Sequence, residues 1–326
     1  IMWFTNSSVY CQNRVTIERI TYRGWKDSYR FSAGPYALVV VPEIGGRIME
    51  YSLNGRNVIW ENPEEYGQTY PITMDWHNYG GYKAWVAPQD LWGWPPDPFL
   101  DFGKANVEVL QEPKGLPVLR LTGCPSLKTG ILFVKEISMS PSGEVTVRQK
   151  MYNIGGKPVS YSIWGVTQVK TPCFVVFPVK NRSKFPEKIS YIMAESRNSR
   201  QFDVKDGLCI TRYVGELGKI GADSDGPWMI WFSDDIAYVK LFDPMDELAT
   251  YPDGGCSVEV FTSEAKLGYL EMEILGPIAE LDPGESTELT ERWRIFKLSQ
   301  PVTDDNRVFK AVFGMQGKGW IPKGLE

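Results

Sequence analysis

The sequence predicts an all-β fold of antiparallel strands with few short helices, and three observations support this prediction. Short runs rich in valine, isoleucine and aromatic residues recur along most of the 326 residues. Clusters of turn-forming residues separate most of these runs, at 141–143, 155–158, 252–255 and 282–284. Within residues 144–153, apolar and polar side chains alternate, which indicates one buried and one wetter face.

Twelve segments fit the strand pattern. In the first half of the chain they are residues 37–41, 47–52, 107–111, 118–121, 131–139 and 144–153. In the second half they are residues 159–169, 228–232, 238–242, 257–262, 270–275 and 288–296. One helix is predicted near 304–313, because an aspartate opens it and Gly314 follows it. No linker or fixed repeat interrupts the chain, so we expect residues 1–326 to form a single domain, in which the strands make one large sandwich or two.

Charge and motifs exclude several classes of function. The net charge is −5 and the 35 basic residues are dispersed, so no nucleic-acid partner is expected. No apolar run approaches the roughly 20 residues of a membrane span, and no oligomeric state is predicted. Signatures of nucleotide-binding proteins, serine hydrolases and zincins are absent, and neither a cofactor nor a metal is expected. A calcium site is neither predicted nor excluded, because four aspartates cluster at residues 223–235 but lack the usual calcium-loop pattern.

The five cysteines predict buried free thiols rather than a disulfide framework. They are odd in number and widely spaced, at positions 11, 124, 173, 209 and 256. Such usage favours a reducing compartment such as the cytoplasm. A secreted or periplasmic location stays open, since a signal peptide is removed from mature chains.

A segment at residues 76–94 concentrates large aromatic side chains. It contains Trp76, Trp85, Trp92 and Trp94, the only histidine, His77, and also Asn78, Tyr79, Tyr82 and Lys83. Glycine and proline interrupt the segment, which predicts a loop rather than a regular element. Aromatic rings on a loop offer a stacking platform to a ligand that is apolar on one face and hydroxylated at its rim, such as a sugar. The alternative is a cap of buried aromatics over one end of the sandwich.

Two glutamates occur two residues apart in a predicted strand. Glu271 and Glu273 should point to one face, about 6.5 to 7 Å apart, while Leu270 and Met272 point to the other. One hypothesis is a general base beside a second acid that raises its pKa. The alternative is a ladder of ion pairs with the arginines at positions 292 and 294.

Several blocks carry a family resemblance. They are GGRI at residues 45–48, GGYKAWVAPQ at 80–89, WGWPP at 92–96, SIWGVTQ at 162–168, YPDGG at 251–255 and YLEMEILGP at 269–277. These blocks, spread from about residue 35 to 296, resemble a domain-of-unknown-function family within the galactose mutarotase-like, or aldose 1-epimerase-like, superfamily. The resemblance implies a large antiparallel β-supersandwich whose concave face binds carbohydrate.

The same resemblance implies roles for two residues. Leu270-Glu271 looks like the mutarotase pair whose glutamate deprotonates the anomeric hydroxyl, and His77 is a candidate for the acid. Mutarotases use two histidines, whereas the strand that would carry the second shows Trp164 and Gln168 here. A different acid, such as Lys83, Lys240 or a tyrosine, would then have to substitute, or the reaction is not epimerisation. The alternative to a catalytic role for His77 is a hydrogen bond within its loop.

Three functions follow as hypotheses. The first is a carbohydrate-binding protein, the second an aldose 1-epimerase-like isomerase with Glu271 as base and His77 or Lys83 as acid. The third is a lyase or hydrolase acting on an acidic polysaccharide. Beside the catalytic candidates Glu271, His77 and Glu273, the residues expected to bind the saccharide are Arg47, Asn78, Lys83, Trp85, Gln89, Trp92, Trp164, Gln168 and Lys240.

Overall fold

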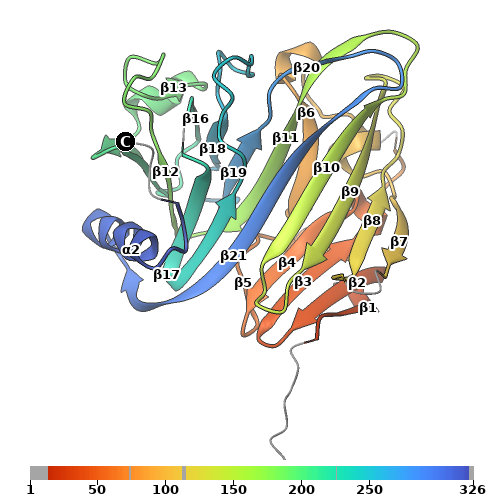
Figure 1. The fold of residues 1–326 in the computed structure, drawn as a ribbon, viewed down its shortest axis with the longest axis horizontal. Helices are drawn as coiled ribbons and strands as arrows, with labels where there is room; N and C mark the ends of the chain where they lie inside the picture. Colours follow the sequence, from red (N-terminus) through yellow and green to blue (C-terminus); the bar gives the residue numbers. More distant parts are fainter. Residues whose placement is uncertain (1–13, 73–74, 112–114, 225, 323–326) are drawn as a thin grey trace, which may run out of the picture.

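The computed structural model describes residues 14–72, 75–111, 115–224 and 226–322. Within these residues the regular structure is mostly antiparallel strand, arranged in two large sheets (Figure 1). The all-β antiparallel class predicted from the sequence is confirmed. No helix in the described ranges is long and apolar enough to cross a membrane.

The larger sheet has 12 strands. Its main path runs in the order β1 (Thr16–Tyr22), β2 (Trp25–Ala33), β3 (Tyr36–Val41), β4 (Arg47–Leu53), β6 (Tyr82–Ala87), β11 (Val159–Lys170), β19 (Tyr269–Leu275), β18 (Val258–Thr262), β16 (Gly218–Ala222) and β13 (Ser190–Tyr191). Two short strands lie off this path, β5 (Arg56–Asn57) on β4 and β20 (Ala279–Leu281) on β11. Segments far apart in sequence therefore meet at the centre of this sheet.

The smaller sheet has nine strands. They follow the order β14 (Phe202–Lys205), β15 (Leu208–Arg212), β12 (Phe174–Pro178), β17 (Trp228–Leu241), β21 (Ser286–Val302), β10 (Val145–Asn153), β9 (Ile131–Met139), β8 (Val118–Thr122) and β7 (Asn106–Leu110). The helices are α1 (Pro98–Asp101), α2 (Asp305–Gly317) and the 3₁₀ turns η1 (Pro42–Ile44), η2 (Pro63–Glu65), η3 (Gln89–Leu91) and η4 (Ala194–Asn198). Asp304 caps α2 by accepting a hydrogen bond from the Arg307 amide, and the helix packs beside β17 (Figure 1).

The main core lies between the two sheets. It combines Phe31, Leu38, Ile48, Leu270, Met272 and Ile274 of the larger sheet with Leu119, Ile137, Val147, Trp231, Trp293 and Ile295 of the smaller one. Each such side chain, fully buried, contributes about 1.5–3 kcal/mol by leaving water. Because the side-chain period of a strand is two, Glu271 and Glu273, which alternate with Leu270, Met272 and Ile274 on β19, must face away from this core.

Two sequence predictions about elements are wrong. The aromatic segment does not form one long loop, since residues 82–87 are strand β6 and Trp85 lies on it. The separate strands predicted at 228–232 and 238–242 are one strand, β17, which continues through a bulge near Asp234, a residue with φ of 56°. The pattern analysis also missed the strands β1, β2, β5, β12, β13, β14, β15, β16 and β20.

The cysteine prediction holds for most of the thiols that the structure describes. Cys173, Cys209 and Cys256 are buried and free, whereas Cys124 is free but only half-buried. Cys11 lies outside the described residues.

Candidate functional site

A cleft of about 390 Å³ lies over the central strands of the 12-stranded sheet. It is on the face opposite the main core, because its floor residues on β19 alternate with the core residues Leu270, Met272 and Ile274. Its lining consists of Trp76, Trp85, Gln89, Asp90, Trp94, Trp164, Ile192, Met193, Lys219, Asp253, Phe261, Tyr269, Glu271 and Glu273. Aromatic rings and carboxylates thus dominate this surface.

The strand register brings the floor together. On β6 and β11, Trp85 lies opposite Trp164, and their rings meet edge to face with centroids 5.3 Å apart. On β18 and β19, Glu259 lies opposite Glu273. Directly opposed side chains in antiparallel strands have Cβ atoms about 4.5–5.5 Å apart, so each pair is held in contact by the backbone.

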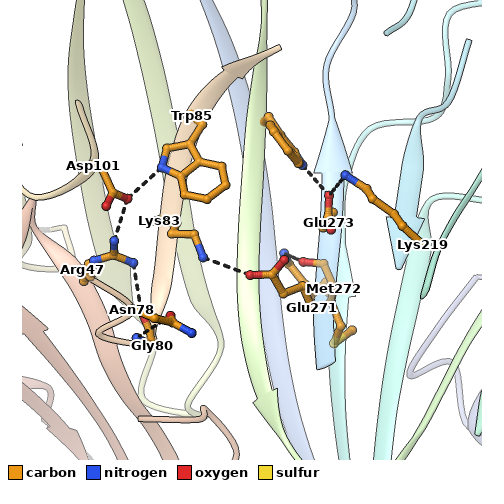
Figure 2. Close-up of polar contacts among 12 residues, drawn as sticks. Arg47, Asn78, Gly80, Lys83, Trp85, Asp101, Lys219, Glu271, Met272 and Glu273 are labelled. Carbon is orange, nitrogen blue, oxygen red and sulfur yellow. Dashed lines mark hydrogen bonds and ion pairs between the residues drawn. The ribbon is translucent and has the colours of Figure 1, made fainter. Parts of the chain in front are cut away.

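Glu271 forms an ion pair with Lys83 at the floor of the cleft. The Lys83 ammonium donates to Glu271 Oε1 at 3.1 Å and lies 4.6 Å from the centroid of the Trp85 ring (Figure 2). The side chains are 2% and 12% exposed, so Lys83 is enclosed and the Glu271 carboxylate reaches the cleft. Burial lowers the pKa of Lys83, and the Glu271 charge opposes that shift. The pair is therefore an acid and a base side by side.

Glu273 belongs to a second ionic group. The Lys219 ammonium lies 3.1 Å from Glu273 Oε2 and 2.7 Å from Glu259 Oε2, and both glutamates are fully buried. The Trp164 indole donates to Glu273 Oε2 at 2.7 Å. Burial raises the pKa of Glu273 and of Glu259, although the Lys219 charge opposes both shifts. The Lys219 pKa rises, because the two carboxylates outweigh the cost of burying the ammonium.

Trp85 is fixed by a buried ion pair behind it. Its indole Nε1 donates to Asp101 Oδ1 at 2.8 Å, and the Arg47 guanidinium donates to the same oxygen at 2.6 Å (Figure 2). Arg47 also donates to the Gly80 carbonyl at 2.9 Å. At 5% exposure Trp85 shows only an edge to the cleft, so it is a supported wall and not a loop residue.

Five of the predicted site residues converge on the cleft. They are Glu271, Glu273, Trp85, Trp164 and Gln89. Lys83 joins them through its ion pair with Glu271. The alternative ladder with Arg292 and Arg294 is absent, since these residues lie on β21 in the other sheet, where Arg294 pairs with Glu144.

His77 is not among the described residues that line the cleft. Its ring stacks on Tyr70 with centroids 3.5 Å apart, and its Nδ1 lies 3.1 Å from Glu65 Oε1. A local contact of this kind was the alternative to a catalytic role for His77.

Three other predicted residues support the cleft from outside. Arg47 holds Asp101 and the Gly80 carbonyl. Asn78 accepts a hydrogen bond from the Gly80 amide at 3.3 Å. Trp92 donates to the Val86 carbonyl at 2.9 Å and packs beside Trp85.

Lys240, on β17 of the smaller sheet, and Gln168, on β11 of the larger sheet, are buried and are not among the described residues that line the cleft. The fully buried Lys240 ammonium lies 2.9 Å from Glu291 Oε2, and Glu291 also accepts from the Tyr82 hydroxyl and the Trp293 indole. Gln168 is fully buried opposite Glu271 in the register of β11 and β19. Lys240 therefore lies in the interior between the two sheets.

Sequence reasoning missed several residues of the site, chiefly Lys219, Glu259, Phe261 and Asp253. Glu259 had a usable signal, because it is a lone acid in the apolar run 258–261, within a predicted strand. Lys219 had none, since its strand β16 is short and rich in glycine. In the part of the chain that the structure describes, no group of three or more His, Cys, Asp or Glu side chains could hold a metal ion.

Comparisons with known proteins agree with this architecture. Residues 29–296 match the family model described as "Domain of unknown function (DUF4380)". No curated protein matches the chain.

Solved structures with the same fold include three bacterial proteins. A proposed aldose 1-epimerase from Klebsiella pneumoniae has a TM-score of 0.59 and 13% identity, over 93% of this chain and 87% of its own. A galactose mutarotase-like protein from Lactobacillus casei has a TM-score of 0.56 and 9% identity, over 86% of this chain and 100% of its own. A proposed aldose 1-epimerase from Escherichia coli K12 has a TM-score of 0.54 and 13% identity, over 87% of this chain and 100% of its own. The chain therefore has the galactose mutarotase-like fold and belongs to the DUF4380 family of domains of unknown function.

Proposed function

We propose that the chain is a carbohydrate-binding protein and that the cleft over β6, β11 and β19 takes the saccharide. The observation that carries this proposal is the composition of the cleft, whose lining combines aromatic rings with carboxylates. A sugar ring has apolar C–H faces and a rim of hydroxyls, so it suits such a surface.

The aromatic residues of the lining supply the stacking surface. Trp94 is 58% exposed, lines the cleft and meets Trp76 edge to face with centroids 4.8 Å apart. Tyr269 and Phe261 lie across the floor, with ring centroids 6.0 Å apart. The volume of about 390 Å³ suits a ligand of one or two sugar rings.

Polar groups supply orientation. Carboxylate oxygens of Glu271 face the cleft and accept hydrogen bonds from ligand hydroxyls, and the Gln89 amide at the rim both donates and accepts. Lys83 keeps the Glu271 carboxylate in place, which lowers the entropy cost of binding.

Calorimetric titration with a panel of mono- and disaccharides tests the proposal. We expect saturable heat with at least one neutral or amino sugar, and loss of that heat in Glu271→Gln. The control is Glu108→Gln, on β7 of the other sheet. Absence of heat across the whole panel, from a protein with a normal melting transition, would contradict the proposal.

A second candidate function is an isomerase of the aldose 1-epimerase type. It is favoured by the Lys83–Glu271 pair, which offers Glu271 as base for the anomeric hydroxyl and Lys83 as acid for the ring oxygen. The optical rotation of freshly dissolved α-glucose and α-galactose should then relax faster with the protein than in buffer alone, and Lys83→Met should remove the difference. Equal rates with and without the wild-type protein would exclude this function for those sugars.

A further inference from the structure

The cleft carries an excess of negative charge. Among the described residues that line it, Asp90, Asp253, Glu271 and Glu273 are acids, whereas Lys219 is the single base. Four carboxylates against one ammonium give a formal charge of −3. The additional buried partners, Lys83 at Glu271 and Glu259 at Lys219, are one base and one acid and leave this charge unchanged.

The imbalance is concentrated at Glu259 and Glu273. These two buried carboxylates share one ammonium, that of Lys219, which lies within 3.1 Å of both. The other titratable groups that act on them are the acids Glu271 and Asp253, the buried thiol of Cys256, the phenol of Tyr269 and the ammonium of Lys240, which is itself paired with Glu291. Two buried carboxylates beside a single ammonium favour a state in which the pair holds one proton between them.

Glu273 is the member of this pair that borders the ligand space. Glu273 lines the cleft, and its Oε2 is occupied by Lys219 and the Trp164 indole. Its Oε1 is buried and has no hydrogen-bond partner among the described residues. An unpartnered buried carboxylate oxygen is costly, and a cationic donor placed in the cleft would satisfy both its charge and its hydrogen bond.

We propose that the cleft selects an amino sugar, whose ammonium group supplies the second positive charge that Glu259 and Glu273 lack. The proposal rests on the proposed saccharide binding and narrows its ligand class. An anionic sugar such as a uronate meets four acids and is disfavoured, and a neutral sugar leaves the pair holding its proton. When the amino sugar binds, its N–H groups donate to Glu273 Oε1, and the proton shared by the pair leaves to solvent.

A matched set of probes tests this selectivity. In the gluco, galacto and manno series, the hexose, the 2-amino-2-deoxyhexose, its N-acetyl derivative and the hexuronate differ at one position each. We expect the amino sugar of at least one series to bind about tenfold or more tightly than its hexose and its N-acetyl derivative, because hydrogen bonds between charged groups are the stronger ones. The hexuronate should bind most weakly.

Proton release separates this mechanism from simple attraction. Calorimetric titrations at a mildly acidic pH, in buffers of different ionisation enthalpy, should show net release of protons with the amino sugar and none with the hexose. An amino sugar that binds tightly without releasing protons would overturn the displacement mechanism. A hexose or hexuronate that binds more tightly than its amino analogue would overturn the selectivity while leaving saccharide binding intact. Absence of binding by every probe would overturn both.

Glu259→Gln tests the role of the hidden carboxylate. Glu259 is fully buried and is not among the described cleft-lining residues, so it acts through charge and not through ligand contact. With Glu259 neutral, Lys219 balances Glu273 alone, and we expect the proton release to vanish and the amino-sugar preference to fall to about twofold or less. The control variant Glu108→Gln should keep both the proton release and the preference for the amino sugar. Unchanged proton release in a folded Glu259→Gln variant would refute the assignment, and the wild-type titrations decide the question independently if that variant does not fold.

Discussion

Replacing Trp94 by alanine is expected to weaken saccharide binding while preserving most of the stability of the fold. Trp94 lines the cleft and is 58% exposed, so about two fifths of it is enclosed, mainly by Trp76 and Trp85. A fully enclosed tryptophan buries about 200 Å², which gives roughly 80 Å² here and, at about 25 cal/mol per Å², at most about 2 kcal/mol of stability.

The exposed part of Trp94 is the part that a sugar ring covers. Removing one stacking aromatic from a binding site costs about 1–3 kcal/mol, which is roughly a 5- to 150-fold increase in Kd. Calorimetric titration with the tightest sugar of the panel measures this change, and urea unfolding measures the stability.

Trp85→Ala is the matched comparison. Trp85 is only 5% exposed and donates to Asp101, so its loss removes about 190 Å² of burial, or roughly 5 kcal/mol, near the upper end of the 3–5 kcal/mol typical of such truncations. We therefore expect Trp85→Ala to lower the free energy of unfolding at least about twice as much as Trp94→Ala. If Trp94→Ala destabilises as much as Trp85→Ala, or leaves the Kd unchanged, then Trp94 is not the stacking surface.

Three further predictions concern groups around the cleft. Asp101→Asn should cost about 3–5 kcal/mol in urea unfolding, because it leaves the buried Arg47 guanidinium without its carboxylate, and a loss below about 1 kcal/mol would contradict this. His77→Phe should keep the stacking on Tyr70 and leave the Kd for sugar within about twofold, whereas a tenfold loss in calorimetry would bring His77 back to the binding site. Burial lowers the pKa of Lys135 to about 7, so above that pH the unfolded chain binds a proton that the native state lacks, and stability should rise with pH up to the pKa of the unfolded lysine. Relative to Lys135→Met, wild type should gain up to about 1.4 kcal/mol per pH unit in this range, and parallel profiles in urea unfolding would refute the assignment.

The sequence predicted most closely two strands whose two faces differ. Residues 131–139 and 144–153 alternate between the core and a wetter face, and both form strands with bounds close to those predicted. Strand β6 was hidden because Gly80, Gly81 and Pro88 flank it, and these residues suggested a loop. Its sequence YKAWVA nevertheless alternates, with Lys83 and Trp85 on the face of the cleft.

Only some residues of the site could be predicted from the sequence. Glu271 and Glu273 could be placed on one face from the strand period alone, and the concentration of aromatic residues at 76–94 pointed to Trp85. Their partners could not be found this way, because Lys219 and Glu259 reach Glu273 through the pairing order β19, β18, β16. Such long-range register is set by packing across the whole sheet and not by any local pattern.

The floor of the cleft lies on paired strands, whereas its rim lies on the connections between strands. Glu271, Glu273 and Trp164 are anchored in hydrogen-bonded ladders at the middle of the larger sheet, whereas Trp94, Asp90 and Asp253 stand on connections between strands. Rim residues can therefore be exchanged at little cost to folding, while floor residues cannot. A designer who wishes to redirect this scaffold towards a new sugar should diversify the connections and leave the ladder untouched.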